Sequence, residues 1–391
     1  AKTRKRWLKR LGYLLFLLVC VEVGLQVFYR LTTGAFLFYR AALPIFTTDE
    51  YRGWAVKPNL AYTHTTNEFS VQLHTNRAGM RVSSHGEEFA FTKDPSKYRI
   101  MLLGPSFAFG WAADFKDCFA AQLESMLESA GFADGKDIEL LNAGVPSLPP
   151  ANNLNWYKHV GRQYQPDLII QLIHGSMAVP NRVSLDYTAD RSGYLVPTHP
   201  SKTTRVKRVA KQFALVFYAW TVYAKLQGAM TPHDSPSPSP AGSIQGAIPA
   251  DAFDPAHPMV REAIGFFDDL RAAAVASGAQ LRVVYFPPAY GVHREDVNRW
   301  IHDGVWDIDL QSAFNQAFCE YLDSRDIVCV NIHHALVAEA RRRSDRLYYW
   351  LDTHWTPAGN RVAARAVADA LLKRPPDSIS PSKPVSRRSA D

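Results

Sequence analysis

Three side chains from two distant parts of the chain have the types and positions that acyl-transfer chemistry requires. Asp352 lies two residues before His354, directly ahead of an apolar run at residues 362–372 that predicts a helix. Far upstream, the apolar run at residues 100–103 predicts a buried strand that ends just before Ser106. A serine becomes a nucleophile when a histidine takes its proton and a carboxylate orients that histidine. The pattern therefore predicts a Ser–His–Asp catalytic triad.

Each of these residues also has a structural interpretation. A serine just after a strand is commonly a helix N-cap, and a histidine in an apolar setting is commonly a hydrogen-bonded structural group. Because a serine nucleophile needs its base, the structural interpretations of Ser106 and His354 hold or fail together. Both interpretations stay open from the residues alone.

Apolar strands and helices alternate from residue 98 onward. The predicted strands are Arg99–Leu103, Ile138–Ala143, Leu168–Ile173, Leu281–Phe286 and Ile327–Ile332. The predicted helices are Phe119–Ser129, Asn152–Gln163, Met259–Ser277, Leu310–Ser324 and Asn360–Leu372. Apolar strands between helices are typical of a parallel sheet with helices on both faces. We expect an α/β domain at residues 98–374, with an insertion at about residues 177–257.

The start of the chain has the pattern of a membrane anchor. Six of the first ten residues are basic, and an apolar stretch at residues 11–30 follows. About twenty helical residues measure roughly 30 Å, which matches a bilayer core. A cleavable signal peptide starts similarly, but this stretch is longer and no small-residue cleavage site precedes Arg30. We expect a single retained helix in a bacterial inner membrane, with residues 1–10 cytoplasmic and the main domain periplasmic.

The remaining segments differ in composition from the α/β domain. Residues 31–97 combine short apolar alternations with turn formers, which predicts a linker and a small β-rich segment. Residues 375–391 have the composition of a low-complexity tail. The whole chain of 391 residues is 47% hydrophobic and 21% charged, with a net charge of +7. This composition is typical of one large domain with appendages.

Two features predict contacts with the membrane or with membrane proteins. Glu22 lies inside the apolar stretch, where an acidic group at the bilayer centre costs about 2.5–3.5 kcal/mol. It either reaches the outer surface or bonds to another transmembrane helix, which implies a partner. The segment Arg205–Gln227 is either a core helix with a basic end or an amphipathic helix against lipid or a partner. The tail, residues 375–391, is a third candidate for contact with an integral-membrane protein.

No pattern of a metal, cofactor or nucleic-acid site is present in the sequence. Cys and His spacings do not resemble zinc sites, and a predicted strand would point His333 and His334 to opposite faces. Cys319 and Cys329 could form a disulfide, which stays open. No Gly-rich phosphate loop occurs, and basic residues are not interleaved with aromatic ones. We therefore expect no cofactor, no metal and no nucleic-acid partner.

Five segments, in order, are similar to the sequence blocks of the SGNH (GDSL-like) hydrolases. The matching segments are Thr75–Arg81, Gly104–Gly110, Asn142–Gly144, Gly175–Met177 and Asp352–Trp355. The chain looks most like the membrane-anchored and exopolysaccharide-acetylating members with an Asp-x-His-Trp motif, and the resemblance covers residues 74–372. It implies a three-layer, flavodoxin-like SGNH fold. It also implies ester hydrolysis or O-acetyl transfer by the triad described above.

The resemblance also implies an oxyanion hole. Its donors would be the backbone N–H groups of Ser106 and Gly144 and an Asn side chain, whose position Ser176 occupies here. Loss of one such donor typically lowers the rate about 10²–10³-fold. The family's Asp before the nucleophile is replaced by Pro105, which removes a backbone donor.

Two functions of different classes follow from these residues. The first is an anchored extracytoplasmic esterase or O-acetyltransferase that acts on a glycan or a small ester, which the triad residues favour. The second is a catalytically degenerate SGNH-like domain that serves as a structural subunit of an integral-membrane complex. The two departures from the family pattern, together with Glu22, favour this second function.

Overall fold

The computed structural model describes most of the chain. The described residues are 2–33, 37, 43–66, 68–174, 187–199, 210, 213–219, 222, 253–296, 308–350 and 352–375. Ser176, most of Arg205–Gln227 and the tail from residue 376 lie outside them, so the expectations for these segments stay predictions.

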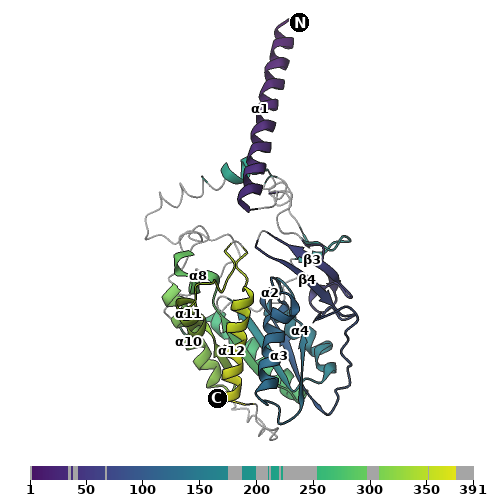
Figure 1. Cartoon of the computed structure of the whole chain (residues 1–391), viewed down its shortest axis with the longest axis vertical. Coiled ribbons are helices and arrows are strands. Elements are labelled where there is room, and N and C mark those ends of the chain that lie inside the picture. Colours follow the sequence, from purple (N-terminus) through teal and green to yellow (C-terminus); the bar gives the residue numbers. More distant parts are fainter. Residues whose placement is uncertain are drawn as a thin grey trace.

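The described elements alternate between strands and helices after residue 97 (Figure 1). The helices are α1 (Lys2–Thr33), α2 (Ser106–Phe109), α3 (Phe119–Ser129), α4 (Pro150–His159), α7 (Pro258–Ala276), α8 (Ala289–Val292), α10 (Ile308–Asp323), α11 (His333–Arg342) and α12 (Pro357–Lys373). The strands are β1 (Phe46–Asp49), β2 (Gly53–Val56), β3 (Ala61–Thr65), β4 (Ser70–Thr75), β5 (Arg81–Val82), β6 (Lys97–Leu103), β7 (Asp137–Asn142), β8 (Leu168–His174), β9 (Tyr187–Ala189), β10 (Leu195–Pro197), β11 (Gln280–Phe286) and β12 (Val328–Asn331).

The main sheet has eight strands in the order β12-β11-β8-β6-β7-β5-β4-β3. The five strands from β12 to β7 pair in parallel, while β5, β4 and β3 continue the sheet with antiparallel pairing. The predicted α/β fold with a mostly parallel sheet is therefore confirmed. Strands β3, β4 and β5 of the segment before residue 97 are thus part of the main sheet, whereas β1 and β2 form a separate two-stranded sheet.

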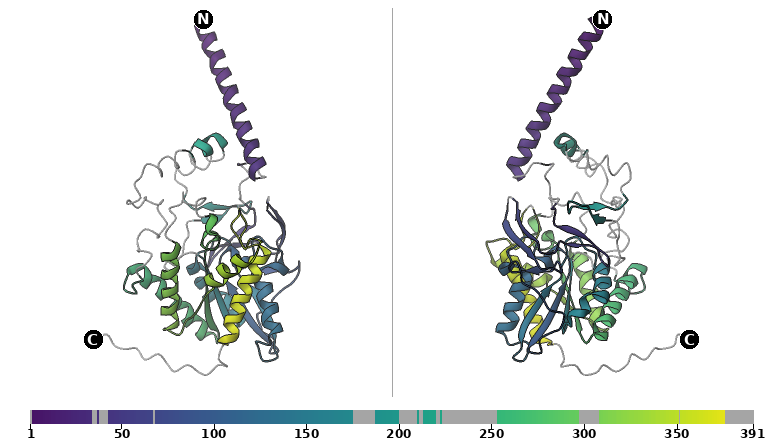
Figure 2. Two further views of the ribbon diagram at one scale, coloured as in Figure 1. Left: turned by 60° about the vertical axis from the view of Figure 1, so that its left-hand side comes forward. Right: turned by 90° about the vertical axis from the view of Figure 1, so that its right-hand side faces the viewer.

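Alternating side chains of β6 bury themselves in two different cores, one on each face of the sheet. Ile100 and Leu102 pack with α3, α8, α11 and α12, whereas Met101 and Leu103 pack with α4, α7 and α10. A strand with a period of two that is apolar at every position needs a helix layer on both faces. Figure 2 shows these two helix layers around the sheet.

The structure contains a helix where the sequence did not indicate one. A strand would have pointed His333 and His334 to opposite faces, but β12 ends at Asn331, one residue before the predicted strand end at Ile332, and both histidines begin α11. Asn331 Oδ1 accepts the N–H of His333 at 3.0 Å, which starts the helix directly after the strand. His333 is a structural group, because its Nδ1 lies 2.7 Å from Ser312 Oγ and its Nε2 3.0 Å from the Gly291 carbonyl oxygen.

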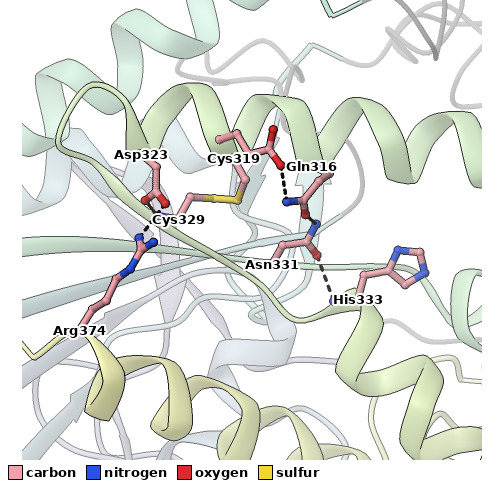
Figure 3. Close-up of a disulfide and its surroundings, with 8 residues drawn as sticks. Gln316, Cys319, Asp323, Cys329, Asn331, His333 and Arg374 are labelled. Atoms are coloured by element: carbon pink, nitrogen blue, oxygen red, sulfur yellow. Dashed lines mark hydrogen bonds and ion pairs between the residues drawn. A yellow bond between two sulfur atoms is a disulfide. The ribbon is translucent and has the colours of Figure 1, made fainter.

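A disulfide joins Cys319 of α10 to Cys329 of β12, as Figure 3 shows. The two Cα atoms are 5.2 Å apart, and the two cysteines are separated by ten positions in the sequence. Arg374 at the end of α12 donates to Asp323 Oδ2 at 2.7 Å beside this bridge. The bond resolves the pairing that the sequence left open.

Helix α1 is long and apolar enough to cross a membrane by length and composition, over Arg6–Leu31. It projects away from the α/β domain in all three views, from the end that carries the β3–β4 hairpin and α2 (Figures 1 and 2). A short helix at residues 214–219, from the insertion, lies beside its C-terminal part. Glu22 does bond to a second helix, but that helix belongs to the same chain.

Candidate active site

The nucleophile loop lies between β6 and α2. Gly104 takes a φ of +154°, and a Cβ there would come within 2.8 Å of the Leu172 side chain and 2.9 Å of that of Ala108. Pro105 is extended, and its carbonyl oxygen accepts the N–H groups of Ala108 and Phe109. Ser106 is thus the first residue of a helical turn, where backbone N–H groups have no partner within the helix. Proline is compatible with this turn, because an N-cap position needs a carbonyl rather than a backbone donor.

The structure brings the three predicted catalytic side chains together. His354 Nε2 lies 2.6 Å from Ser106 Oγ, and His354 Nδ1 lies 2.5 Å from Asp352 Oδ1. Burial raises the pKa of Asp352, but its hydrogen bond and charge interaction with His354 outweigh burial and keep that pKa below its usual value. Asp352 is therefore ionised at neutral pH. An ionised carboxylate holds the imidazole with its Nδ1 protonated, so that Nε2 faces the serine as an acceptor.

Backbone strain is located at Thr353, the residue between Asp352 and His354. Thr353 has a φ of +69°, in the left-handed region that β-branched residues avoid. Such a conformation costs on the order of 1–3 kcal/mol and persists only where its surroundings impose it. The turn lets Asp352 Oδ1 meet both the Nδ1 and, at 3.3 Å, the backbone N–H of His354.

The residues after His354 fix this loop to the core. Trp355 is buried among the rings of Phe107, Phe119 and Phe286. Thr356 caps α12 by accepting the N–H of Gly359, and its hydroxyl donates to the Arg346 carbonyl oxygen at 2.7 Å. Trp355 therefore anchors the loop in the core, and its packing fixes the position of the adjacent His354 imidazole.

A carboxylate from the β3–β4 turn holds the catalytic loop from the other side. Glu68 accepts the backbone N–H of Trp350 through Oε1 at 2.7 Å and that of Asp352 through Oε2 at 2.8 Å. Charged acceptors make short, strong hydrogen bonds to backbone donors. Sequence reasoning missed Glu68, since it lies 284 positions before Asp352.

Aromatic rings surround the imidazole. The Phe107 ring lies 4.6 Å from that of His354, and the Trp111 ring stacks on it at 5.9 Å, both measured between centroids. His64 follows behind Trp111 at 4.8 Å and is only 6% exposed. Within the described residues neither of its ring nitrogens has a hydrogen-bond partner. Burial lowers the pKa of His64 to about 4, so it is neutral at pH 7.

The backbone N–H groups predicted as oxyanion donors have different surroundings. The N–H of Ser106 opens α2, as described above. The N–H of Gly144 donates to Asn142 Oδ1 at 3.1 Å, and a Cβ on Gly144 would approach the Phe109 nitrogen to 2.5 Å. Asn142 Nδ2 donates to the Ala108 carbonyl oxygen at 2.8 Å, so the Asn-x-Gly block braces the nucleophile turn. Ser176 lies outside the described residues.

The Thr75–Arg81 segment supports the same turn. Asn76 Oδ1 accepts the N–H groups of Ala78 and Met80, which closes the turn between β4 and β5. Arg81 is fully buried and donates to the carbonyl oxygens of Gln72 and Ala113. This motif therefore ties the antiparallel strands to the chain that follows the nucleophile.

Residues 250–390 match the family described as SGNH hydrolase-like domain, acetyltransferase AlgX. This match confirms the predicted resemblance to the SGNH hydrolases for the C-terminal part of the chain, where one of the five segments, Asp352–Trp355, lies. The matched range includes Asp352 and His354, while Ser106 precedes it. A comparison with curated proteins finds no match.

Solved structures of several hydrolases are similar to this chain. The lipase/acylhydrolase from Enterococcus faecalis is 11% identical, with 71% of this chain and 96% of that chain covered and a TM-score of 0.37. A catalytic mutant of Axe2, an acetylxylan esterase from Geobacillus stearothermophilus, is 9% identical, with coverages of 70% and 93% and a TM-score of 0.37. LAE5, an alpha/beta hydrolase enzyme from the metagenome of Lake Arreo, Spain, is 13% identical, with coverages of 72% and 98% and a TM-score of 0.38.

Proposed function

We propose that this protein is a membrane-anchored esterase or O-acetyltransferase whose nucleophile is Ser106. The observation that carries the proposal is the continuous chain of hydrogen bonds from Ser106 Oγ through His354 to Asp352. A structural serine or histidine needs no such ordered chain of hydrogen bonds. In addition, the strained residue Thr353 lies between the two members Asp352 and His354.

The arrangement supports a two-step acyl transfer. Ser106 Oγ attacks the ester carbonyl carbon while His354 Nε2 takes the hydroxyl proton. The C–O bond to the leaving alcohol then breaks, and the alcohol oxygen receives that proton, which leaves the acyl group on Ser106. In the second step His354 Nε2 takes a proton from water or from an acceptor hydroxyl, and the oxygen so activated attacks the acyl carbon. The bond from that carbon to Ser106 Oγ then breaks and Oγ takes the proton back, which completes hydrolysis with water or transfer with the acceptor. We propose an acetylated glycan as substrate, in line with the acetyltransferase family description.

A serine-reactive phosphonate tests the proposal directly. We expect the full-length protein in detergent to be labelled on Ser106, Ser106→Ala to be unlabelled, and Ser125→Ala, on the surface of α3, to be labelled like the wild type. Equal labelling of wild type and Ser106→Ala, or no labelling of a folded wild type, overturns the proposal. The second outcome would favour a degenerate domain that serves as a subunit of a membrane complex.

A further inference from the structure

We propose that the helix at residues 214–219, with its neighbours Phe213 and Val222, inserts into the lipid of the outer leaflet beside α1. The domain would then contact the membrane at two places instead of one. The proposal rests on the membrane anchoring within the proposed function and is independent of triad activity.

The first observation is how Glu22 is used. Its Oε1 accepts the backbone N–H of Ala214 at 2.7 Å, and its Oε2 accepts that of Leu215 at 2.9 Å. Gln26 Nε2 donates to the same carboxylate at 2.8 Å. An acidic group in an apolar stretch is costly unless it is hydrogen-bonded. The short helix supplies those bonds, and Glu22 in turn supplies acceptors for N–H groups that begin a helix.

A second contact with α1 lies nearer the end of that helix. The Phe28 ring lies 6.1 Å from that of Tyr218, and the Tyr29 ring lies 5.7 Å from that of Phe217. Six or seven positions on α1, roughly 10 Å, separate these residues from Glu22. The short helix therefore contacts α1 along about two helical turns rather than at one point. These turns are the last two of the apolar stretch.

The faces that do not contact α1 are apolar and exposed. The exposed fractions are 49% for Phe213, 39% for Leu215, 39% for Val216 and 56% for Val222. In the sequence no charged residue occurs between Lys211 and Lys225. An apolar run of 10–14 residues is typical of a buried core helix or an interfacial segment, and exposure excludes the core.

Lipid is the occupant that fits this surface. The exposed side chains continue the apolar surface of α1, on which Val21, Val23 and Val27 are also exposed, at a similar position along the helix axis. Glu22 lies eight residues before Arg30, about 12 Å inside the end of the stretch. In the sequence, Arg205, Lys207, Arg208 and Lys211 precede the helix. Anionic headgroups attract such basic clusters, at about 1 kcal/mol for each basic residue near the surface.

Quenching by brominated lipid tests the proposal on the full chain in nanodiscs of phosphatidylcholine and phosphatidylglycerol. The fluorophore is attached to Val216→Cys in a chain that also carries Cys20→Ser, which removes the exposed native cysteine. Under non-reducing conditions the other cysteines do not react, because Cys118 is buried and Cys319 and Cys329 form a disulfide. Leu17→Cys on α1 and Val275→Cys on α7, both exposed, are the matched controls. We expect quenching at position 216 close to that at 17 and several-fold above that at 275.

The other outcomes are distinguishable. Quenching of position 216 by aqueous iodide instead of brominated lipid places the helix in water, and protection from both quenchers means that protein covers it; either result overturns the proposal. Absence of lipid quenching at position 17 overturns the anchoring itself. Glu22→Ala should raise iodide quenching at 216, whereas Val23→Ala, beside it and exposed, should not. Phosphonate labelling of Ser106 is measured separately, so failure of catalysis does not affect these readings.

Discussion

Asp352 has two tasks in the site, and both depend on its charge. It accepts from His354 Nδ1 and from the backbone N–H of the same residue, and Glu68 holds its own N–H. The side chain therefore selects the histidine tautomer and shapes the loop. Pro105, the one departure from the family pattern that lies within the described residues, leaves the hydrogen bonds from Ser106 through His354 to Asp352 in place.

Asp352→Asn should leave the fold intact but lower kcat for a nitrophenyl ester about 10³–10⁴-fold, because an amide favours the wrong imidazole tautomer. The matched control is Asp345→Asn, since Asp345 pairs with Arg343 on the surface. A steady-state assay at pH 7 checks both variants. Retention of wild-type kcat in Asp352→Asn would contradict the triad.

His64 makes the stability of the domain depend on pH. Its pKa of about 4 in the folded state lies below the ordinary value of 6.5, because burial disfavours the charged ring while Asp352 partly offsets that effect. The unfolded chain therefore binds the proton more readily as pH falls. The contribution of neutral His64 is fully present above pH 6.5 and is lost as pH falls towards 4.

His64→Phe should flatten this dependence and raise the urea midpoint between pH 4 and 6 relative to the wild type. Phe keeps the ring contacts with Phe69 and Trp111 and removes two unpaired nitrogens. Urea unfolding at several pH values measures the slope. His85→Gln, at an exposed position, should keep the slope of the wild type; an unchanged slope in His64→Phe would refute the assignment.

Among the elements, the β3–β4 hairpin contributes to the candidate active site. It joins the main sheet through β5 and places Glu68 against the loop that precedes α12. The buried side chains of β2 and β4 pack against Phe109 and Val145, beside the nucleophile turn. The antiparallel strands therefore position both halves of the triad.

Glu68→Gln should lower kcat about 10–100-fold with little change in KM, because one of two backbone bonds is lost and small displacements of the base are costly in rate. Glu88→Gln is a matched control, since Glu88 also accepts a backbone N–H, that of Arg77, away from the site. Kinetics combined with the urea midpoint separate positioning from stability. A fall in stability with unchanged kcat would assign Glu68 a purely structural role.

In the whole molecule, α1 lies at the end of the domain where α2, which begins with Ser106, is located (Figure 1). The carboxyl ends of parallel strands meet at one edge of the sheet, and ligand sites of α/β folds form there. The loops after β6 and before α12 lie at this edge, as does the hairpin that follows the anchor. A membrane-anchored domain in this orientation would present Ser106 towards the bilayer surface.

The basic residues in the first ten positions, at the start of α1, predict that the domain lies outside the cytoplasm. Alkaline phosphatase fused after Arg374 should therefore be active in a bacterial host, and green fluorescent protein fused there should be dark. Both reporters need only the orientation of α1, not catalysis. A fluorescent fusion together with an inactive phosphatase fusion would contradict the predicted topology and place the domain in the cytoplasm.

The local patterns of the sequence were sufficient for the α/β fold, and they pointed to three residues that the structure joins by hydrogen bonds. Apolar runs mark β6, β8 and β11 because strands covered on both faces must be apolar throughout. Ser106, Asp352 and His354 were found because each lies next to such an element. The α11 helix was missed, since its apolar positions are few and it follows the strand directly.

What required the tertiary structure is everything that depends on contact between distant segments. Glu68 and His64 carry no local signal, because a single Glu or His has many meanings. The sequence predicted a helix within Arg205–Gln227 but left open what it contacts. Their roles follow from the pairing of β3 with β4, the approach of the catalytic loop and the contact with Glu22. Sequence periodicity reports which face of an element is buried, whereas only the folded chain decides which partner buries it.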